Sequence, residues 1–256
     1  MGKYTKQFII GSKWSGRYGD LVVLEYTNKK NILVKFLLTG FEKYTDASAI
    51  KRGTVKDPYF PTVASVGSIG NTTSSVNGKV KRSYHTWRGI ISRCYEYKKA
   101  TQTYFGKVEV CKEWWCFENF EKWYDDNCIE RFQVDKDLTV IGAKIYSPET
   151  CSFIPNRINC IMGKKDYNTV RKHLNLPVGV SYHVRDEKYT AQCFDGEKLQ
   201  HFGYHDTPEK AFQAYKKFKE SVLKKVAQEY YDLGQINNTV YENLMNYEVT
   251  PFYDRD

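Results

Sequence analysis

The sequence predicts an α+β protein built from several small units. Three observations indicate this class. Strand-like runs rich in β-branched and aromatic residues occupy the first 66 residues. Apolar residues recur at helical spacing in the middle of the chain. After residue 177, three short strand-like runs precede one long amphipathic stretch. A chain of 256 residues is long enough for two or three small domains, each with its own core.

The N-terminal part, residues 1–66, is expected to form a small β module. The runs 21–26 and 32–37 have strand character, and the polar residues 28–31 between them are typical of a hairpin turn. Nothing in this part points to catalysis, so we expect an accessory binding unit. Residues 67–80 are dense in Gly, Ser, Thr and Asn, a composition typical of a flexible connector.

The middle part, residues 81–162, is rich in aromatic side chains. Trp87, Ile90, Ile91 and Cys94 predict a helix over 83–95, and a second helix carries Trp114, Phe117, Phe120, Trp123 and Tyr124. Strands are expected at 132–138 and 151–154, followed by a helix over 156–162. Most of these aromatic residues are expected to be core.

A basic stretch, residues 163–175, follows the middle part and contains Lys164, Lys165, Arg171 and Lys172. These cations would suit contacts with phosphates if DNA passes nearby. A solvated linker without any partner is the alternative interpretation. Both remain open at this point.

Residues 176–233 have the clearest pattern. We expect strands at 179–185, 188–195 and 198–202, with a hairpin turn at Asp195-Gly196. Thr207, Pro208 and Glu209 suit the start of a helix, which can run to residue 233. The remaining residues, 234–256, are expected to form a polar tail with a short helix.

Several positions in this last module follow the order of a known family: Pro177, Gly179, Val180, Lys188, Tyr189, Ala191, Gly203, Asp206, Thr207, Glu209, Ala211, Ala214 and Tyr215. The module resembles the Apetala-type DNA-binding domain of plant ethylene-response factors and phage homing endonucleases. The resemblance implies that one sheet face lies in the DNA major groove. By position, its contact residues would be Ser181, His183, Arg185, Gln192, Phe194, Leu199 and His201. Arg185 suits guanine and Gln192 suits adenine, whereas Ser181, Phe194 and Leu199 depart from the Arg and Trp of the plant proteins.

The middle part has a second resemblance, carried by Trp87, residues 93–95, 110–111, 113–114, Phe117, Phe120 and Trp123, then by 134–138, 146–151, Pro155 and residues 158–159. It is similar to phage HNH-type endonucleases, which commonly carry an Apetala-type domain. The resemblance implies a ββα site with a His base and a divalent metal.

The expected Asp-His pair of that site aligns with Asp135-Lys136, and no His occurs between residues 86 and 172. Asp135, Lys136 and Asn159 are therefore the candidate catalytic residues, and Asp135 with Asp137 would hold Mg²⁺ or Mn²⁺ if the site is active. Either the unit survives as a DNA-binding scaffold, which we favour, or a variant site cleaves slowly. Asp135 and Asp137 as plain turn carboxylates are a third interpretation.

The formal net charge of +9 favours polyanionic partners. We therefore expect binding to double-stranded DNA at a preferred site. An active metal-dependent endonuclease or nickase is one alternative, and a non-enzymatic phage effector that holds a host protein or nucleoprotein is another. No apolar run approaches the roughly 18 residues of a membrane span, and the first residues have no apolar signal region. We expect no membrane partner and a location in the cytoplasm, that of the host cell if the chain is phage-encoded.

Overall fold

The structure is a computed structural model that describes residues 8–98, 104–163 and 175–251. It confirms the α+β class. The chain divides into two compact units, Met1–Asp126 with Lys144–Ser147, and Asn127–Ala143 with Pro148–Asp256. Each unit is described by itself below. In the described part of the chain, none of the helices has the length and apolar character needed to cross a membrane.

The first unit begins with a four-stranded antiparallel sheet in the order β1-β2-β3-β4, made of β1 (Lys13–Gly16), β2 (Gly19–Asn28), β3 (Asn31–Phe36) and β4 (Glu42–Thr45). Its core is formed by alternate side chains of β2 and β3, such as Val23, Ile32 and Val34, which are fully buried. Helix α1 (Ala47–Lys51) follows and is capped by the Asp46 carboxylate, which accepts a hydrogen bond from the amide of Ala49. The two predicted strands correspond to β2 and β3.

The predicted connector at 67–80 is bound to the rest of the first unit, so its prediction as a flexible linker is wrong. It contains a short hairpin of β5 (Ser75–Val76) and β6 (Lys79–Val80). The Asn71 amide donates to the Glu118 carboxylate at 3.0 Å, and the Thr72 hydroxyl donates to Glu121 at 2.6 Å. The backbone amide of Asn71 and the hydroxyl of Thr72 thus serve as hydrogen-bond donors to a helix.

The aromatic middle of the first unit consists of α2 (Arg82–Tyr95), β7 (Glu109–Val110), the 3₁₀ turn η2 (Lys112–Trp115), α3 (Phe117–Asn127) and β9 (Ile145–Tyr146). Both predicted helices are present, but the second begins at Phe117, and Trp114, which was predicted in that helix, lies in η2. Trp87 and Trp114 are fully buried, and the indole of Trp87 donates to the Trp114 carbonyl at 2.7 Å. Phe117 and Phe120 complete this core, with rings 5.4 Å from Trp87 and 5.0 Å from Trp114 respectively.

The second unit contains a ββα element and a sheet backed by a helix. The ββα element consists of β8 (Phe132–Asp135), β10 (Ser152–Pro155) and α4 (Asn156–Met162), with β8 and β10 antiparallel. The three-stranded antiparallel sheet has the order β11-β12-β13, from β11 (Val180–His183), β12 (Lys188–Phe194) and β13 (Leu199–His205). Helices α6 (Pro208–Asp232) and α7 (Asn238–Met245) follow.

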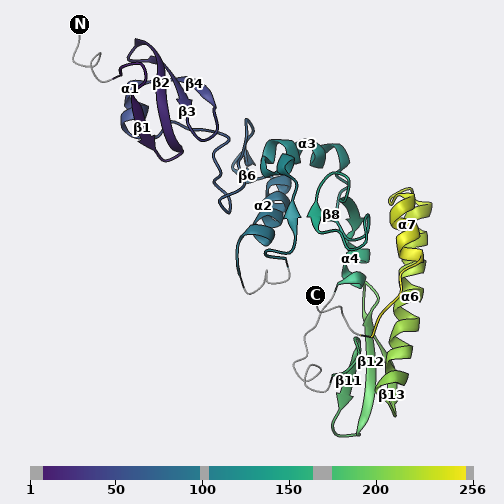
Figure 1. Cartoon of the computed structure of the whole chain (residues 1–256). Coiled ribbons are helices and arrows are strands. Elements are labelled where there is room, and N and C mark those ends of the chain that lie inside the picture. The colour runs from purple at the N-terminus through teal and green to yellow at the C-terminus, as the bar shows by residue number, and fades with distance from the viewer. Residues whose placement is uncertain (1–7, 99–103, 164–174, 252–256) are drawn as a thin grey trace. The chain divides into compact units, whose positions relative to one another are not determined.

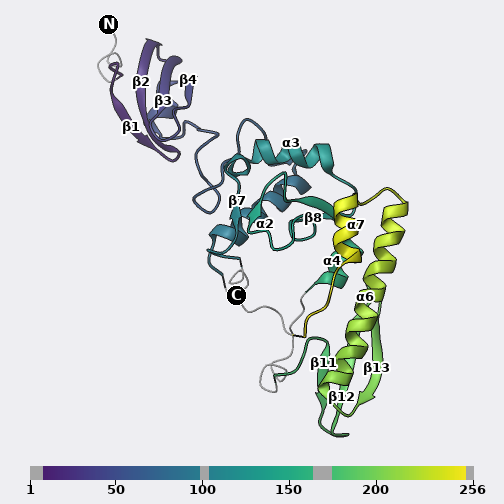
Figure 2. The same ribbon diagram turned by 45° about the vertical axis from the view of Figure 1, so that its right-hand side comes forward.

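Helix α6 contributes to two separate cores (Figures 1 and 2). Its N-terminal half covers one face of the sheet, where Ala211, Phe212 and Tyr215 pack with Val180, Ala191 and Cys193. Burial there raises the pKa of the Cys193 thiol to about 11. Its C-terminal half packs against the ββα element and α7 through Leu223, Val226, Ala227, Leu138, Ile154, Ile158, Ile161, Ile236, Val240 and Leu244. One continuous helix therefore joins the sheet to the ββα element.

This packing corrects two predictions about segments. The stretch 234–256 is not a polar tail in its described part, because Ile236, Val240 and Leu244 are buried in the core with α6, and Val249 is buried in the sheet core. The middle part 81–162 is not one unit either, since its ββα element belongs to the second unit. Apolar periodicity shows which face of a helix is buried but not which element covers it.

The shared core predicts a large effect of a single truncation. Leu223 has no exposed surface, so Leu223→Ala should lower the free energy of unfolding by about 2–5 kcal/mol. Leu233, at the C-terminal cap of α6, is 68% exposed. Leu233→Ala should change the free energy of unfolding by less than about 0.5 kcal/mol. Urea unfolding of both variants measures this. Equal effects would mean that α6 is not packed as described.

Candidate nucleic-acid interface

The face of the β11–β13 sheet that is turned away from α6 carries polar and aromatic side chains. Strand pairing places Gln192 opposite His201, and Phe194 opposite Leu199. Because alternate residues of a strand point to opposite faces, these four side chains lie on one side while Ala191 and Cys193 point into the core with α6. Ser181 and His183 reach the same side from β11, opposite Thr190 and Lys188.

A β-bulge adds a residue to this face that the sequence prediction missed. The register between β12 and β13 shifts at Thr190/Gln192, so that Thr190 faces Tyr204 while Gln192 faces His201. Tyr204 is 57% exposed, and its ring lies 5.4 Å from that of His183 in an edge-on contact. Gly203 at the shift has φ +76°, a conformation that glycine adopts readily. Because bulges often contain a glycine with positive φ, Gly203 was the one residue in the sequence that could have indicated the bulge.

The third strand is accordingly longer than predicted and the first is shorter. β13 continues to His205 instead of ending at residue 202, and β11 ends at His183. Arg185 was predicted on β11, but it lies in the exposed turn 184–187 that connects β11 with β12. Arg185 is therefore not part of the sheet face from which it was predicted to contact a base. It belongs to a turn in which Glu187 has a left-handed backbone conformation, with φ +49°.

Close packing fixes the sheet on α6. Gly179 has φ +77°, and a Cβ at this position would come within 2.1 Å of the Tyr215 ring. Lys188 forms an ion pair with Asp206 across the junction between β12 and α6. Thr207 caps α6 by accepting a hydrogen bond from the amide of Lys210 at 3.3 Å. Gly179, Lys188 and Thr207 thereby fix the position of the sheet relative to α6.

Arg157 of the ββα element connects the same sheet to α6. One of its guanidinium nitrogens donates to Glu229 of α6 at 3.0 Å, and the other lies 3.5 Å from Glu197 in the β12–β13 turn. A Cβ on Gly196 in this turn would come within 2.5 Å of the Arg157 side chain. The end of the sheet and the start of α4 are therefore in direct contact.

The basic stretch that was predicted to contact phosphates lies outside the described residues. Lys164, Lys165, Arg171 and Lys172 are all in this stretch, so the choice between a phosphate strip and a solvated linker stays as the sequence leaves it.

Asp135 is the last residue of β8, and its carboxylate accepts hydrogen bonds from backbone amides of the turn that follows. Its Oδ1 atom accepts hydrogen bonds from the amides of Asp137 at 2.8 Å and Leu138 at 2.9 Å. Burial raises the pKa of this carboxyl group, and the nearby charge of Asp137 adds to the effect, although the two amides oppose it. The side chain predicted to bind a metal thus forms the local structure of the loop after β8.

The other predicted catalytic side chains are also engaged in hydrogen bonds or ion pairs. Lys136 is buried and pairs with the carboxylate of Asp137. The Asn159 amide donates to the Gln133 side chain at 3.0 Å, and Gln133 in turn donates to Asn156 at 2.7 Å. These contacts bring the candidate residues onto one ββα element, but each has a structural partner.

Both predicted metal ligands have structural partners. Oδ1 of Asp135 accepts two backbone amides, and Oδ1 of Asp137 pairs with the buried Lys136. Nowhere among the described residues do three His, Cys, Asp or Glu side chains come together in a group that could hold a metal ion.

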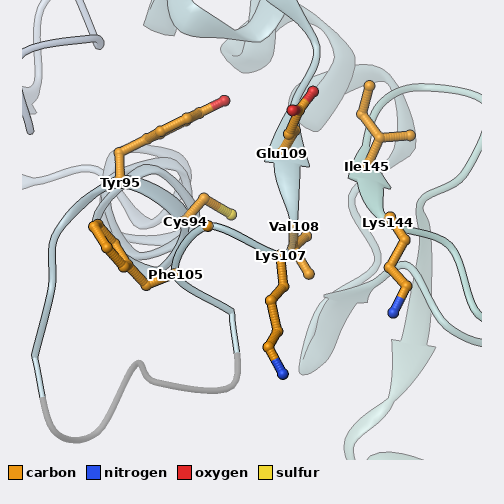
Figure 3. A pocket seen from close by; sticks show the side chains of 9 residues that line it. Cys94, Tyr95, Phe105, Lys107, Val108, Glu109, Lys144 and Ile145 are labelled. Carbon is orange, nitrogen blue, oxygen red and sulfur yellow. The ribbon is translucent and has the colours of Figure 1, made fainter. Parts of the chain in front are cut away.

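A pocket of about 420 Å³ lies in the first unit, between the end of α2 and the pair β7–β9. Figure 3 shows the ammonium groups of Lys107 and Lys144 on one side and the Glu109 carboxylate on the other. All three are exposed, so their charges are solvated. These three exposed charged groups do not form a nucleophile held beside a general base.

The turn role of Asp135 predicts a clear difference between two substitutions. Asp135→Asn keeps an oxygen for the two amides and should leave the free energy of unfolding within about 0.5 kcal/mol, whereas Asp135→Ala should cost about 1–2 kcal/mol. Adding Mg²⁺ or Mn²⁺ should not raise the melting temperature of the wild type. A metal-dependent rise that Asp135→Asn abolishes would show instead that Asp135 is a ligand.

Comparison of the chain with protein-family models, with curated proteins and with solved structures found no match.

Proposed function

We propose that the chain binds double-stranded DNA with the outer face of the β11–β13 sheet and reads a preferred site there. The observation that carries this proposal is the division of the sheet into two faces. One face is buried against α6 by Val180, Ala191 and Cys193. The other presents Gln192 and His201 as a cross-strand pair. A two- or three-stranded β surface of this kind can enter the major groove, where amide and imidazole groups reach base edges.

The charge of the chain supports the same partner. A formal net charge of +9 attracts the phosphates of DNA and accelerates association. On the sheet itself, Lys188 is held by Asp206, so most of the electrostatic attraction has to come from other parts of the chain. The basic stretch 163–175 precedes β11 by a few residues only, and phosphate contacts from this stretch would position the sheet on the duplex.

In this proposal the ββα element is a scaffold and not a nuclease centre. Arg157 and the core around Leu223 attach the element to the sheet and to α6. The hydrogen bonds of Asp135 and the ion pair of Lys136 serve the fold. The HNH-like pattern would then persist because the element supports the DNA-reading sheet.

The test uses duplexes selected by the full-length chain from a random library. Gln192→Ala should weaken binding to the selected duplex by about 1–3 kcal/mol and binding to random duplexes much less, because a bidentate amide contact specifies one base. Fluorescence anisotropy at fixed salt measures both affinities. Gln200→Ala is the matched control, since Gln200 pairs with Cys193 in register and is hydrogen-bonded to Asp195 at 2.8 Å.

An equal loss on selected and random duplexes would contradict base reading by the sheet. The salt dependence of binding distinguishes DNA from a host protein as the partner. DNA binding should weaken linearly in a plot of log affinity against log salt, because bound phosphates release counterions. Salt-insensitive capture of a host protein, without measurable DNA binding, would favour the effector interpretation instead.

A further inference from the structure

The end of the sheet next to the β12–β13 turn carries an exposed apolar pair. Phe194 and Leu199 face each other across the two strands, and they are 37% and 52% exposed. Both side chains lie on the outer face, two residues along from the pair Gln192–His201. Exposed apolar surface is unfavourable in water. An exposed apolar pair beside hydrogen-bonding side chains is therefore a candidate site for contact with a ligand.

The chemistry around this pair limits what it can contact. Among the described residues on the outer side of the three strands there is no arginine, the side chain that most often reads guanine. Gln192 is the side chain that suits adenine, through its N6 and N7 atoms. The adjacent cross-strand pair on this face, Gln192–His201, is polar, so the apolar area at this end of the sheet stays small for a protein-protein interface.

We propose that the sheet reads A·T base pairs through the C5-methyl group of thymine, with Phe194 and Leu199 as the apolar contacts and Gln192 as the reader of adenine. This inference rests on the proposed function, because it names the base pairs that the same face selects. Thymine is the base that presents a methyl group in the major groove of unmodified DNA. A cytosine methylated at C5 presents the same group at the same edge, so the test has to separate these two sources.

The spacing of the sheet is compatible with this assignment. A strand rises about 3.3 Å per residue, and one DNA strand advances about 3.4 Å per nucleotide. Side chains two residues apart, such as Gln192 and Phe194, therefore reach base pairs about two steps apart when β12 follows the groove. A short run of A·T pairs would supply adenine edges and thymine methyl groups at both positions.

The experiment compares duplexes that differ in the methyl group alone. The full-length chain is titrated against an A·T duplex and the same duplex with deoxyuridine for thymidine, and against a G·C duplex with and without 5-methylcytosine. The wild type should bind the thymine duplex about fourfold more tightly for each contacted methyl. Phe194→Ala combined with Leu199→Ala should bind the thymine and uracil duplexes equally. Val184→Ala, which truncates a side chain 76% exposed in the turn after β11, should keep the discrimination.

Three results would overturn the inference, and they have different meanings. Equal affinity of the wild type for the thymine and uracil duplexes, with DNA binding intact, removes the methyl contact and leaves the proposed function standing. Tightest binding to the 5-methylcytosine duplex assigns the methyl group to modified cytosine and removes the A·T assignment. No binding to any duplex contradicts the proposed function itself.

Discussion

The packing of helix α6 against two groups of apolar side chains determines how the second unit is built. Its first half covers the sheet through Ala211, Phe212 and Tyr215. Its second half, with Leu223 at the centre, holds the ββα element and α7. A single helix is stiff over this length because each residue is tied to the next turn by backbone hydrogen bonds. The sheet and the ββα element are therefore parts of one body, and Arg157 reinforces the junction.

In the ββα element, the polar residues that follow β8 serve the local structure. The loop after β8 needs an acceptor for two amides, and Asp135 supplies it. A buried lysine needs a counter-charge, and Asp137 supplies it for Lys136. These contacts and the core with α6 stabilise the element. On the outward face of the sheet, Lys188 pairs with Asp206 and His183 lies 3.1 Å from Asp186, whereas Phe194, Leu199 and Tyr204 are exposed.

Local sequence patterns predicted the elements well because local rules decide them. Turn residues and alternation located β2, β3, β11 and β12, and Thr207 marked the start of α6. Long-range packing was not predictable in this way. Ile236, Val240 and Leu244 look like part of a polar tail until α6 and α4 are placed beside them. Tyr204 was missed because the predicted strand ended at residue 202. Strict alternation beyond that point would also have placed Tyr204 on the α6 side, whereas the bulge at Gly203 places it on the outer face.

The central claim, DNA binding without the chemistry of a nuclease, is tested most directly on supercoiled DNA. The purified full-length chain is incubated with plasmid in the presence of Mg²⁺, Mn²⁺ or EDTA, and mobility shift and nicking are followed on the same samples. We predict a shift that is independent of the metal, with the plasmid remaining supercoiled. Metal-dependent nicking that Asp135→Ala abolishes would contradict the claim and show that the ββα element is a working nuclease centre.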